Sequence, residues 1–155
     1  MPTAWRLLKA KHLATAWDGE GAQQYGGRWN SPGVRVVYTS GTLALAVLEV
    51  LAHLQDSEPL LAYSAIPLKF DEALVSALDP ATLPANWRDY PSPPEVTALG
   101  DQWVRRNTSA VLRVPSAIVT VEDNFLLNPG HRDFAKIRIG KPRKFAFDAR
   151  LTGRR

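Results

Sequence analysis

Residues 34–52 read VRVVYTSGTLALAVLEVLA, and this stretch decides the fold class. Residues 34–39 are β-branched and aromatic, which predicts a buried strand. Ser40 and Thr42 are residue types that cap helices, and they predict a helix over residues 43–55. A strand is therefore expected to pass directly into a helix at this point of the chain.

The remaining pattern consists of short strands and one further helix. Residues 95–106 are predicted to be helical, because Val96, Leu99 and Trp103 form one apolar stripe. Residues 21–33 and the proline-rich residues 80–94 are expected to be irregular, and residues 128–130 to form a turn. Further strands are predicted at residues 4–9, 60–70, 110–114, 117–121, 134–139 and 144–148. Strands and helices do not alternate strictly, so we expect an α+β fold with few helices and no Rossmann motif.

Composition narrows the class of protein. The chain of 155 residues suits one domain, residues 1–155, with a real hydrophobic core. No apolar run approaches the roughly 20 residues that a membrane span requires, and no signal-peptide pattern is present, so a cytoplasmic protein with no membrane contact is expected. There is no cysteine, and His12, His53 and His131 have no metal-ligand spacing, so no metal is expected.

The net charge of +4 is concentrated near the end of the chain. One interpretation is a solvated strand face with a frayed tail, and the other is a patch for an acidic or phosphate-bearing partner. Aromatic residues that stack on bases are not interleaved with these charges, so direct nucleic-acid binding is not expected. The basic residues concerned are Arg132, Lys136, Arg138, Lys141, Arg143, Lys144, Arg150, Arg154 and Arg155.

Glu49 is the first candidate for chemistry. Residues 43–52 are apolar on every helical face except at Glu49, which predicts a buried helix carrying one carboxylate. Burying such a carboxylate is costly unless it is paired, so it forms an ion pair, points to solvent through a gap, or faces a cleft. In a cleft it would face a developing cation or hydrogen-bond a substrate hydroxyl. His53 lies one turn later, where it would orient Glu49 or simply lie at the surface.

Three further residues are candidates for binding. Arg28 follows Gly26 and Gly27, so it either grips a phosphate or a ribose or stacks on Trp29 as an ordinary loop arginine. Tyr38 either closes over a flat cationic ligand or is a core tyrosine. Ser116 is a candidate of the same kind and, taken alone, reads as a turn residue, since no G-x-S-x-G motif supports a hydrolase triad.

Taken together, these residues resemble the RES domain, which is named for its Arg, Glu and Ser. The similarity covers about residues 5–147, and the ordered set is more specific than any one piece. The matching stretches are GGRWN at residues 26–30, VVYTS at 36–40, LALAVLE at 43–49, VPS at 114–116 and NFLLNP at 124–129, followed by His131 and Asp133-Phe134. Residues 80–94 match nothing in the pattern.

The resemblance implies an ADP-ribosyltransferase-like split β-structure with NAD in a cleft. It implies the toxin of a toxin–antitoxin pair that depletes NAD by cutting the nicotinamide–ribose bond, with an Xre-type helix-turn-helix antitoxin covering the active site. Glu49 would be the catalytic carboxylate, Arg28 and Ser116 would bind the NAD phosphates or ribose, and Tyr38 would pack on the nicotinamide side. NAD is then a substrate, and no prosthetic group is implied.

Two other functions stay open at this point. The same site would serve an ADP-ribosyltransferase that modifies a protein target. A binding module without enzymatic activity would instead use the basic C-terminal quarter and would turn over no NAD. Where NAD is cleaved, the sequence does not choose between water, phosphate and a protein side chain as the acceptor.

Overall fold

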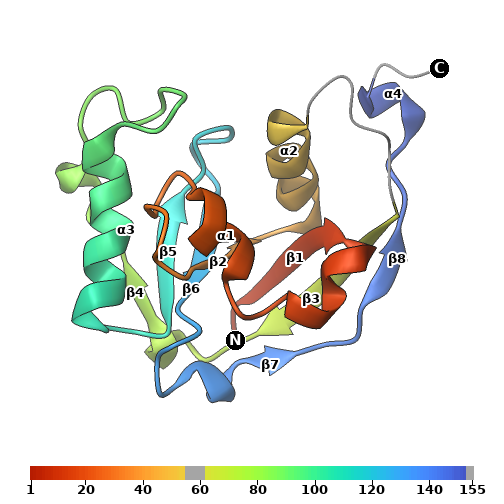
Figure 1. Cartoon of the computed structure of the whole chain (residues 1–155), viewed down its shortest axis with the longest axis horizontal. Helices are drawn as coiled ribbons and strands as arrows, with labels where there is room; N and C mark the ends of the chain where they lie inside the picture. The colour runs from red at the N-terminus through yellow and green to blue at the C-terminus, as the bar shows by residue number, and fades with distance from the viewer. Residues whose placement is uncertain (55–61, 153–155) are drawn as a thin grey trace.

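One mixed β-sheet with helices packed around it makes up the computed structural model, which describes residues 1–54 and 62–152 (Figure 1). The strands are β1 (Thr3–Lys9), β2 (Val37–Ser40), β3 (Tyr63–Lys69), β4 (Val75–Ala77), β5 (Val111–Pro115), β6 (Asp123–Leu127), β7 (Arg138–Ile139) and β8 (Arg143–Phe145). The α-helices are α1 (Glu20–Tyr25), α2 (Leu43–His53), α3 (Pro94–Arg106) and α4 (Ala149–Thr152). Short 3₁₀ helices are η1 (Ala10–Thr15), η2 (Glu72–Leu74), η3 (Pro80–Thr82) and η4 (Phe134–Lys136). The α+β class is confirmed.

The sheet consists of two halves that meet at a narrow junction. Its strand order is β4-β5-β6-β2-β1-β3-β7, with β8 also paired to β3, and only β4 and β5 are parallel. β1 and β3 pair along their full lengths, whereas β1 and β2 pair only at Trp5 and Ser40. The predicted split β-structure is therefore present, and the strands on both sides of the junction also line the cleft described below.

Strand β2 passes into helix α2 at the predicted point of the chain, but α2 is less buried than predicted. Thr42 caps α2, and its hydroxyl accepts a hydrogen bond from the Leu45 backbone N–H at 3.1 Å. Leu45 and Ala46 are buried, but Leu48 is 41% exposed. The expectation of a helix buried on every face is wrong, because the sheet covers only one side of α2. The predicted helix end at residue 55 lies outside the described residues.

The predicted loop at residues 21–33 was wrong over its first part, which forms α1. The helix is short, and the Asp18 carboxylate accepts a hydrogen bond from the Glu20 backbone N–H at 2.9 Å just before it begins. It ends at Gly26, whose φ of 75° is one that glycine adopts without steric cost. The glycine and polar residues of this segment led to the loop prediction, although local hydrogen bonds support a short helix there.

Two predicted strands were also wrong. Residues 117–121 form turns and bends, because the Ser116 hydroxyl accepts hydrogen bonds from the backbone N–H groups of Ile118 and Val119 and bends the chain. The strand comes later, as β6. Residues 134–139 begin as η4, and only Arg138–Ile139 is a strand. In both segments turn hydrogen bonds override the β-propensity of the side chains.

The other predicted elements are present with shifted ends. β1, β5 and α3 match closely, and residues 80–94 are irregular apart from η3 and the first residue of α3. The strand expected at 60–70 is observed as β3, its first two residues lying outside the described part, and the one expected at 144–148 is observed as β8. No helix in residues 1–54 and 62–152 is long and apolar enough to cross a membrane.

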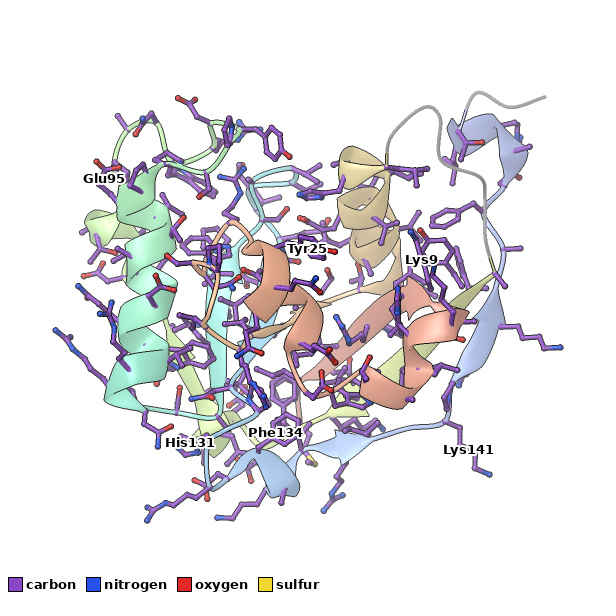
Figure 2. The ribbon with its side chains drawn as sticks, in the orientation of Figure 1. Lys9, Tyr25, Glu95, His131, Phe134 and Lys141 are labelled. Atoms are coloured by element: carbon purple, nitrogen blue, oxygen red, sulfur yellow. The ribbon has the colours of Figure 1, made fainter. Side chains whose placement is uncertain are left out.

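The basic C-terminal residues lie on the surface. Every lysine and arginine from Arg132 to Arg150 is exposed, and several lie on or beside the edge strands β7 and β8. Figure 2 shows the Lys141 side chain extending away from the body of the molecule. Charges on edge strands discourage pairing with other chains, which agrees with the first of the two interpretations above.

Candidate active site

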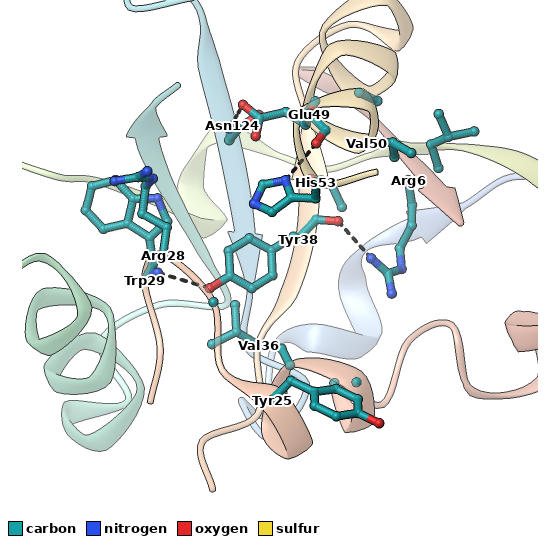
Figure 3. A pocket seen from close by; sticks show the side chains of 18 of the residues that line it. Arg6, Tyr25, Arg28, Trp29, Val36, Tyr38, Glu49, Val50, His53 and Asn124 are labelled. Atoms are coloured by element: carbon teal, nitrogen blue, oxygen red, sulfur yellow. Dashed lines mark hydrogen bonds between the residues drawn. The ribbon is translucent and has the colours of Figure 1, made fainter. Parts of the chain in front are cut away.

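A cleft of about 570 Å³ opens between the sheet and the segments around α1 and α2 (Figure 3). β1, β2 and α2 each contribute to its walls, and so do α1 and the loop that follows it. The lining includes Arg6, Arg28, Tyr38, Glu49, His53 and Asn124. Glu49, Arg28 and Tyr38 were predicted to share one site, and the fold brings all three together although they lie on three separate segments.

Glu49 reaches the cleft from the inner side of α2. Its Oε1 atom accepts two hydrogen bonds, from the Ser116 hydroxyl at 2.8 Å and from the Asn124 side-chain amide at 3.0 Å. Among the described residues, no partner is found for Oε2. The carboxylate is thus fixed at one oxygen and left open at the other, and it is not part of an ion pair within the described part of the chain.

Ser116 is a turn residue and also a partner of Glu49. It is completely buried, and its oxygen accepts backbone hydrogen bonds from Ile118 and Val119, both at 3.1 Å. With these two donors in place, the hydroxyl hydrogen points to Glu49. Ser116 is not among the residues lining the cleft, so direct contact with a ligand stays a prediction.

Arg28 is held by the proline-rich segment that sequence analysis could not assign. Its Nη1 atom donates to the backbone carbonyls of Trp87 at 2.7 Å and Asp89 at 3.1 Å. Nε and Nη2 have no partner among the described residues. Partial burial lowers the pKa of Arg28, and the charge of Glu49 opposes this shift. The alternative of Arg28 stacking on Trp29 is not found among the described contacts.

The loop that carries Arg28 is anchored from several sides. Trp29 is 2% exposed and packs in the core with Val96 and Trp103. Asp101 on α3 accepts hydrogen bonds from the Ser31 backbone N–H at 2.9 Å and from its hydroxyl at 2.6 Å. These contacts fix the backbone at residues 29–31, so the position of Arg28 is set by α3 as well as by its own side-chain bonds.

Tyr38 joins this loop to the sheet. Its hydroxyl donates to the Asn30 side-chain oxygen and accepts from the Trp29 backbone N–H at 3.1 Å. Burial raises the pKa of Tyr38 well above its ordinary value. The hydroxyl is therefore engaged by protein, and the ring is the part that Figure 3 shows between Arg28 and Arg6. Packing of this ring on nicotinamide stays a prediction.

Arg6 is a site residue that the sequence analysis missed. Its Nε donates to the Ala16 carbonyl at 2.7 Å and its Nη1 to the Tyr38 carbonyl at 3.0 Å. Burial lowers its pKa to about 10, and Asp18 opposes the shift. The available signal was an arginine within the apolar strand AWRLL, because a cation in a largely apolar strand calls for a partner or a ligand.

His53 does not contact the Glu49 carboxylate. Its Nδ1 atom donates to the backbone carbonyl of Glu49 at 2.8 Å, and its ring meets Tyr90 edge-on, with 6.0 Å between the ring centroids. The side chain is exposed. The surface role was therefore the better of the two interpretations of His53.

Comparison with known proteins agrees with the resemblance. The family model described as "RES domain" matches residues 3–148. A protein of Yersinia enterocolitica named "Toxin Res" is 38% identical over 148 residues, which is 95% of this chain and 97% of that protein. A Sphingobium protein named "Prs ADP-ribosylating toxin" is 39% identical over 152 residues, covering 95% and 94%. The crystal structure of the M. tuberculosis MbcT-MbcA toxin-antitoxin complex contains a chain with the same fold, at a TM-score of 0.77 and 18% identity over 93% of this chain and 84% of that one.

Proposed function

The chain belongs to the RES-domain family, and we propose that it is the toxin of a toxin–antitoxin pair that depletes NAD by cleaving the bond between nicotinamide and ribose. The observation that carries this proposal is the state of Glu49. Its carboxylate is held at Oε1 by Ser116 and Asn124 and is open at Oε2, in a cleft that also presents Arg6 and Arg28.

The chemistry of the reaction suits one carboxylate. As the C–N bond breaks, nicotinamide leaves with the bonding electron pair as a neutral molecule, so no general acid is needed. The ribose develops positive charge, as in glycoside hydrolysis. A negative group beside it stabilises the transition state more than the ground state. The acceptor then bonds to the ribose carbon and gives up its proton.

The two arginines suit the pyrophosphate of NAD. Both use part of the guanidinium group on backbone carbonyls, and each keeps at least one nitrogen without a partner among the described residues. Figure 3 shows them on either side of Tyr38. Charge-assisted hydrogen bonds from arginine to phosphate are among the strong ones, so we assign Arg6 and Arg28 to binding. NAD enters as substrate, and no prosthetic group is proposed.

Glu20 is a second carboxylate in the lining of the cleft, and it separates this mechanism from that of an ordinary glycosidase. It is exposed on α1, and no hydrogen bond in the described part of the chain connects it to Glu49. The proposed reaction needs no protonation of the leaving group, so Glu20→Gln is expected to keep near wild-type turnover. A loss as large as that in Glu49→Gln would instead indicate a pair of catalytic carboxylates.

The proposal is tested by incubating the purified chain with NAD, with and without inorganic phosphate. Release of nicotinamide is expected in at least one condition. ADP-ribose as the second product identifies hydrolysis, and its 1″-phosphate identifies phosphorolysis. No loss of NAD under any condition would contradict the proposal, and it would leave a binding module without enzymatic activity or a transferase that needs its protein target.

ADP-ribosylation of a protein is the second candidate, favoured by the 39% identical relative whose name states that activity. It uses the same cleft and the same cleavage, with a protein side chain as acceptor. Mass spectrometry separates the two functions. An ADP-ribosyl adduct on a protein, formed in proportion to the nicotinamide released, would identify the transferase.

We further propose that an Xre-type helix-turn-helix antitoxin covers the cleft. Exposed apolar side chains lie around it: Tyr25 lines the cleft, Tyr90 contacts the lining residue His53, and Ile118 follows the lining residue Ala117. Exposed apolar groups of this kind are typical of surfaces that bind a partner. The pair would act in the cytoplasm, where the substrate NAD is available.

A further inference from the structure

Asn124 lies in the cleft beside Glu49 and donates a hydrogen bond to one oxygen of its carboxylate. It lies on β6, where it is paired with Ser40 of β2 on one side and Val114 of β5 on the other. It is only 9% exposed, and its side chain lines the cleft. Its backbone is thus fixed by two neighbouring strands, which makes it a rigid point of attachment for another side chain.

The hydrogen bonds of Glu49 are arranged unequally. Asn124 and Ser116 both donate to Oε1, at 3.0 and 2.8 Å, and nothing in the described part of the chain donates to Oε2. Glu49 is only partly buried, and no other side chain in the described part of the chain forms a hydrogen bond or an ion pair with its carboxylate. The two donors are therefore what sets the rotation of the carboxylate.

The other end of the Asn124 amide is left without a partner. Its Oδ1 atom is buried and has no hydrogen-bond donor, and it is the only such side-chain atom in residues 1–54 and 62–152. Buried polar atoms are nearly always paired, and an exception calls for a reason. Turning the amide over would place Oδ1 against the Glu49 carboxylate, where two acceptors would repel each other. The amide is therefore oriented for Glu49 and not for its own full pairing.

From this arrangement we infer that Asn124 is a positioning residue for the reaction, one that turns Glu49 so that Oε2 faces the ribose. The inference rests on the proposed function, because it assigns Glu49 the role of stabilising the ribose cation. Asn124 itself need not touch the substrate. Ser116 shares the task, but its hydroxyl also holds the turn at residues 117–119, so Asn124 is the cleaner residue to test.

The test compares NAD cleavage by Asn124→Ala and Asn124→Asp with wild type. A misplaced catalytic group costs roughly 100-fold in rate, so kcat is expected to fall by that order while KM changes by less than about threefold. Asn124→Asp keeps the size of the side chain, removes the donor and adds a like charge, and it should lose at least as much. Near wild-type kcat in either variant would overturn the inference.

A matched control comes from the same part of the sheet. Asn128 follows β6, is 4% exposed and donates its side-chain amide to Asn107 at 3.1 Å, outside the cleft. Asn128→Ala should lower the melting temperature and leave kcat unchanged when it is assayed below that temperature. A merely structural role for Asn124 would give the same result in Asn124→Ala as in this control.

A crystal structure of Asn124→Ala gives a second readout that does not depend on activity. The Glu49 side chain is expected to leave its present rotamer or to occupy more than one. A single unchanged rotamer would overturn the inference. If the wild type does not cleave NAD, the proposed function fails, and this structure still decides whether Asn124 positions Glu49.

Discussion

The guanidinium group of Arg28 is held by hydrogen bonds at only one of its three nitrogens within the described part of the chain. Nη1 donates to two carbonyls of the segment at residues 80–94, and Nε and Nη2 have no partner in the described part of the chain. Arg28→Lys is expected to raise KM for NAD about tenfold or more. An ammonium group lacks the planar guanidinium that can bond the two carbonyls and a ligand at the same time. Steady-state kinetics on folded variants measure this, with the exposed strand residue Arg113→Lys as control. An unchanged KM in Arg28→Lys would remove Arg28 from the binding site.

The Tyr38 hydroxyl must stay protonated to keep both of its hydrogen bonds to the loop at residues 29–30, so stability is expected to depend on pH. The folded protein keeps this group neutral, because burial raises the pKa of Tyr38 above the value of 10.0 that it has when exposed. Unfolded chains lose the proton as the pH passes about 10, so this contribution to stability is fully present below pH 10 and declines progressively as the pH rises above it.

Tyr38→Phe therefore has a defined pH signature. The substitution removes two hydrogen bonds and should lower the free energy of unfolding by about 1–3 kcal/mol at pH 7. The difference from wild type should shrink above pH 10, as measured by denaturant unfolding over pH 7–11. A difference that stays constant across this range would show that the hydroxyl is not held neutral by burial.

A residue of the site could be predicted from the sequence only where it interrupts a local pattern of apolar residues. Glu49 was found because it interrupts an apolar run, although the helix proved half exposed and not buried. Asn124 and Arg6 were missed, since their significance lies in partners far away in the chain: Asn124 meets Glu49, and Arg6 meets the carbonyl of Tyr38. No local pattern contains such contacts.

Among the elements, α3 helps to position the loop that carries Arg28, which its sequence alone did not indicate. An apolar stripe predicted the helix, but not that Gly100 would lie where it packs against the loop that carries Arg28. A Cβ atom built there would lie 1.7 Å from the Trp29 carbonyl oxygen, in backbone that carries Arg28. The helix can pack against the loop only because this position has no side chain.

Gly100→Ala is therefore expected to be severely destabilising. Overpacking commonly costs about 1–3 kcal/mol, and the loss here should reach or exceed the top of that range because backbone must move. Thermal melting measures it. Gly21→Ala is the control, since nothing lies within 4 Å of its Cβ and it is in a helix, so stability should stay equal or rise by up to about 1 kcal/mol. Similar melting temperatures for both variants would contradict this account.

Elements were mispredicted where a side chain bonds to nearby backbone. Residues 118–121 read IVTV, a strand by composition, yet the Ser116 hydroxyl turns the chain there and thereby reaches Glu49. The hydrogen bonds of Ser116 therefore explain both why the strand prediction was wrong and how Ser116 comes to contact Glu49. The buried strands β1 and β5 and the helix α3, which follow apolar periodicity alone, were predicted well.

At the scale of the whole molecule, the antitoxin is proposed to bind over the cleft, which is lined by Ala117 from the turn that follows Ser116. Val121 is 90% exposed on the turn after Ser116. Val121→Asp should weaken antitoxin binding by at least tenfold, because an interface buries a charge at high cost, while NAD turnover stays unchanged. Calorimetry with the cognate antitoxin measures it. Ile139→Asp on the far edge strand should leave affinity unaltered, and equal affinities for all three proteins would place the antitoxin elsewhere.

The charge of Glu49 is the central claim, and one kinetic measurement tests it most directly. NAD cleavage is followed as a function of NAD concentration, up to saturation, for wild type, Glu49→Gln and Glu72→Gln, after melting curves show that all are folded. Glu72 is an exposed glutamate outside the cleft. Glutamine keeps the shape and removes the charge. Loss of such an electrostatic group costs on the order of a hundredfold or more in rate, so Glu49→Gln should lose that much kcat with KM little changed, and Glu72→Gln should match wild type. Near wild-type turnover in Glu49→Gln would contradict the account.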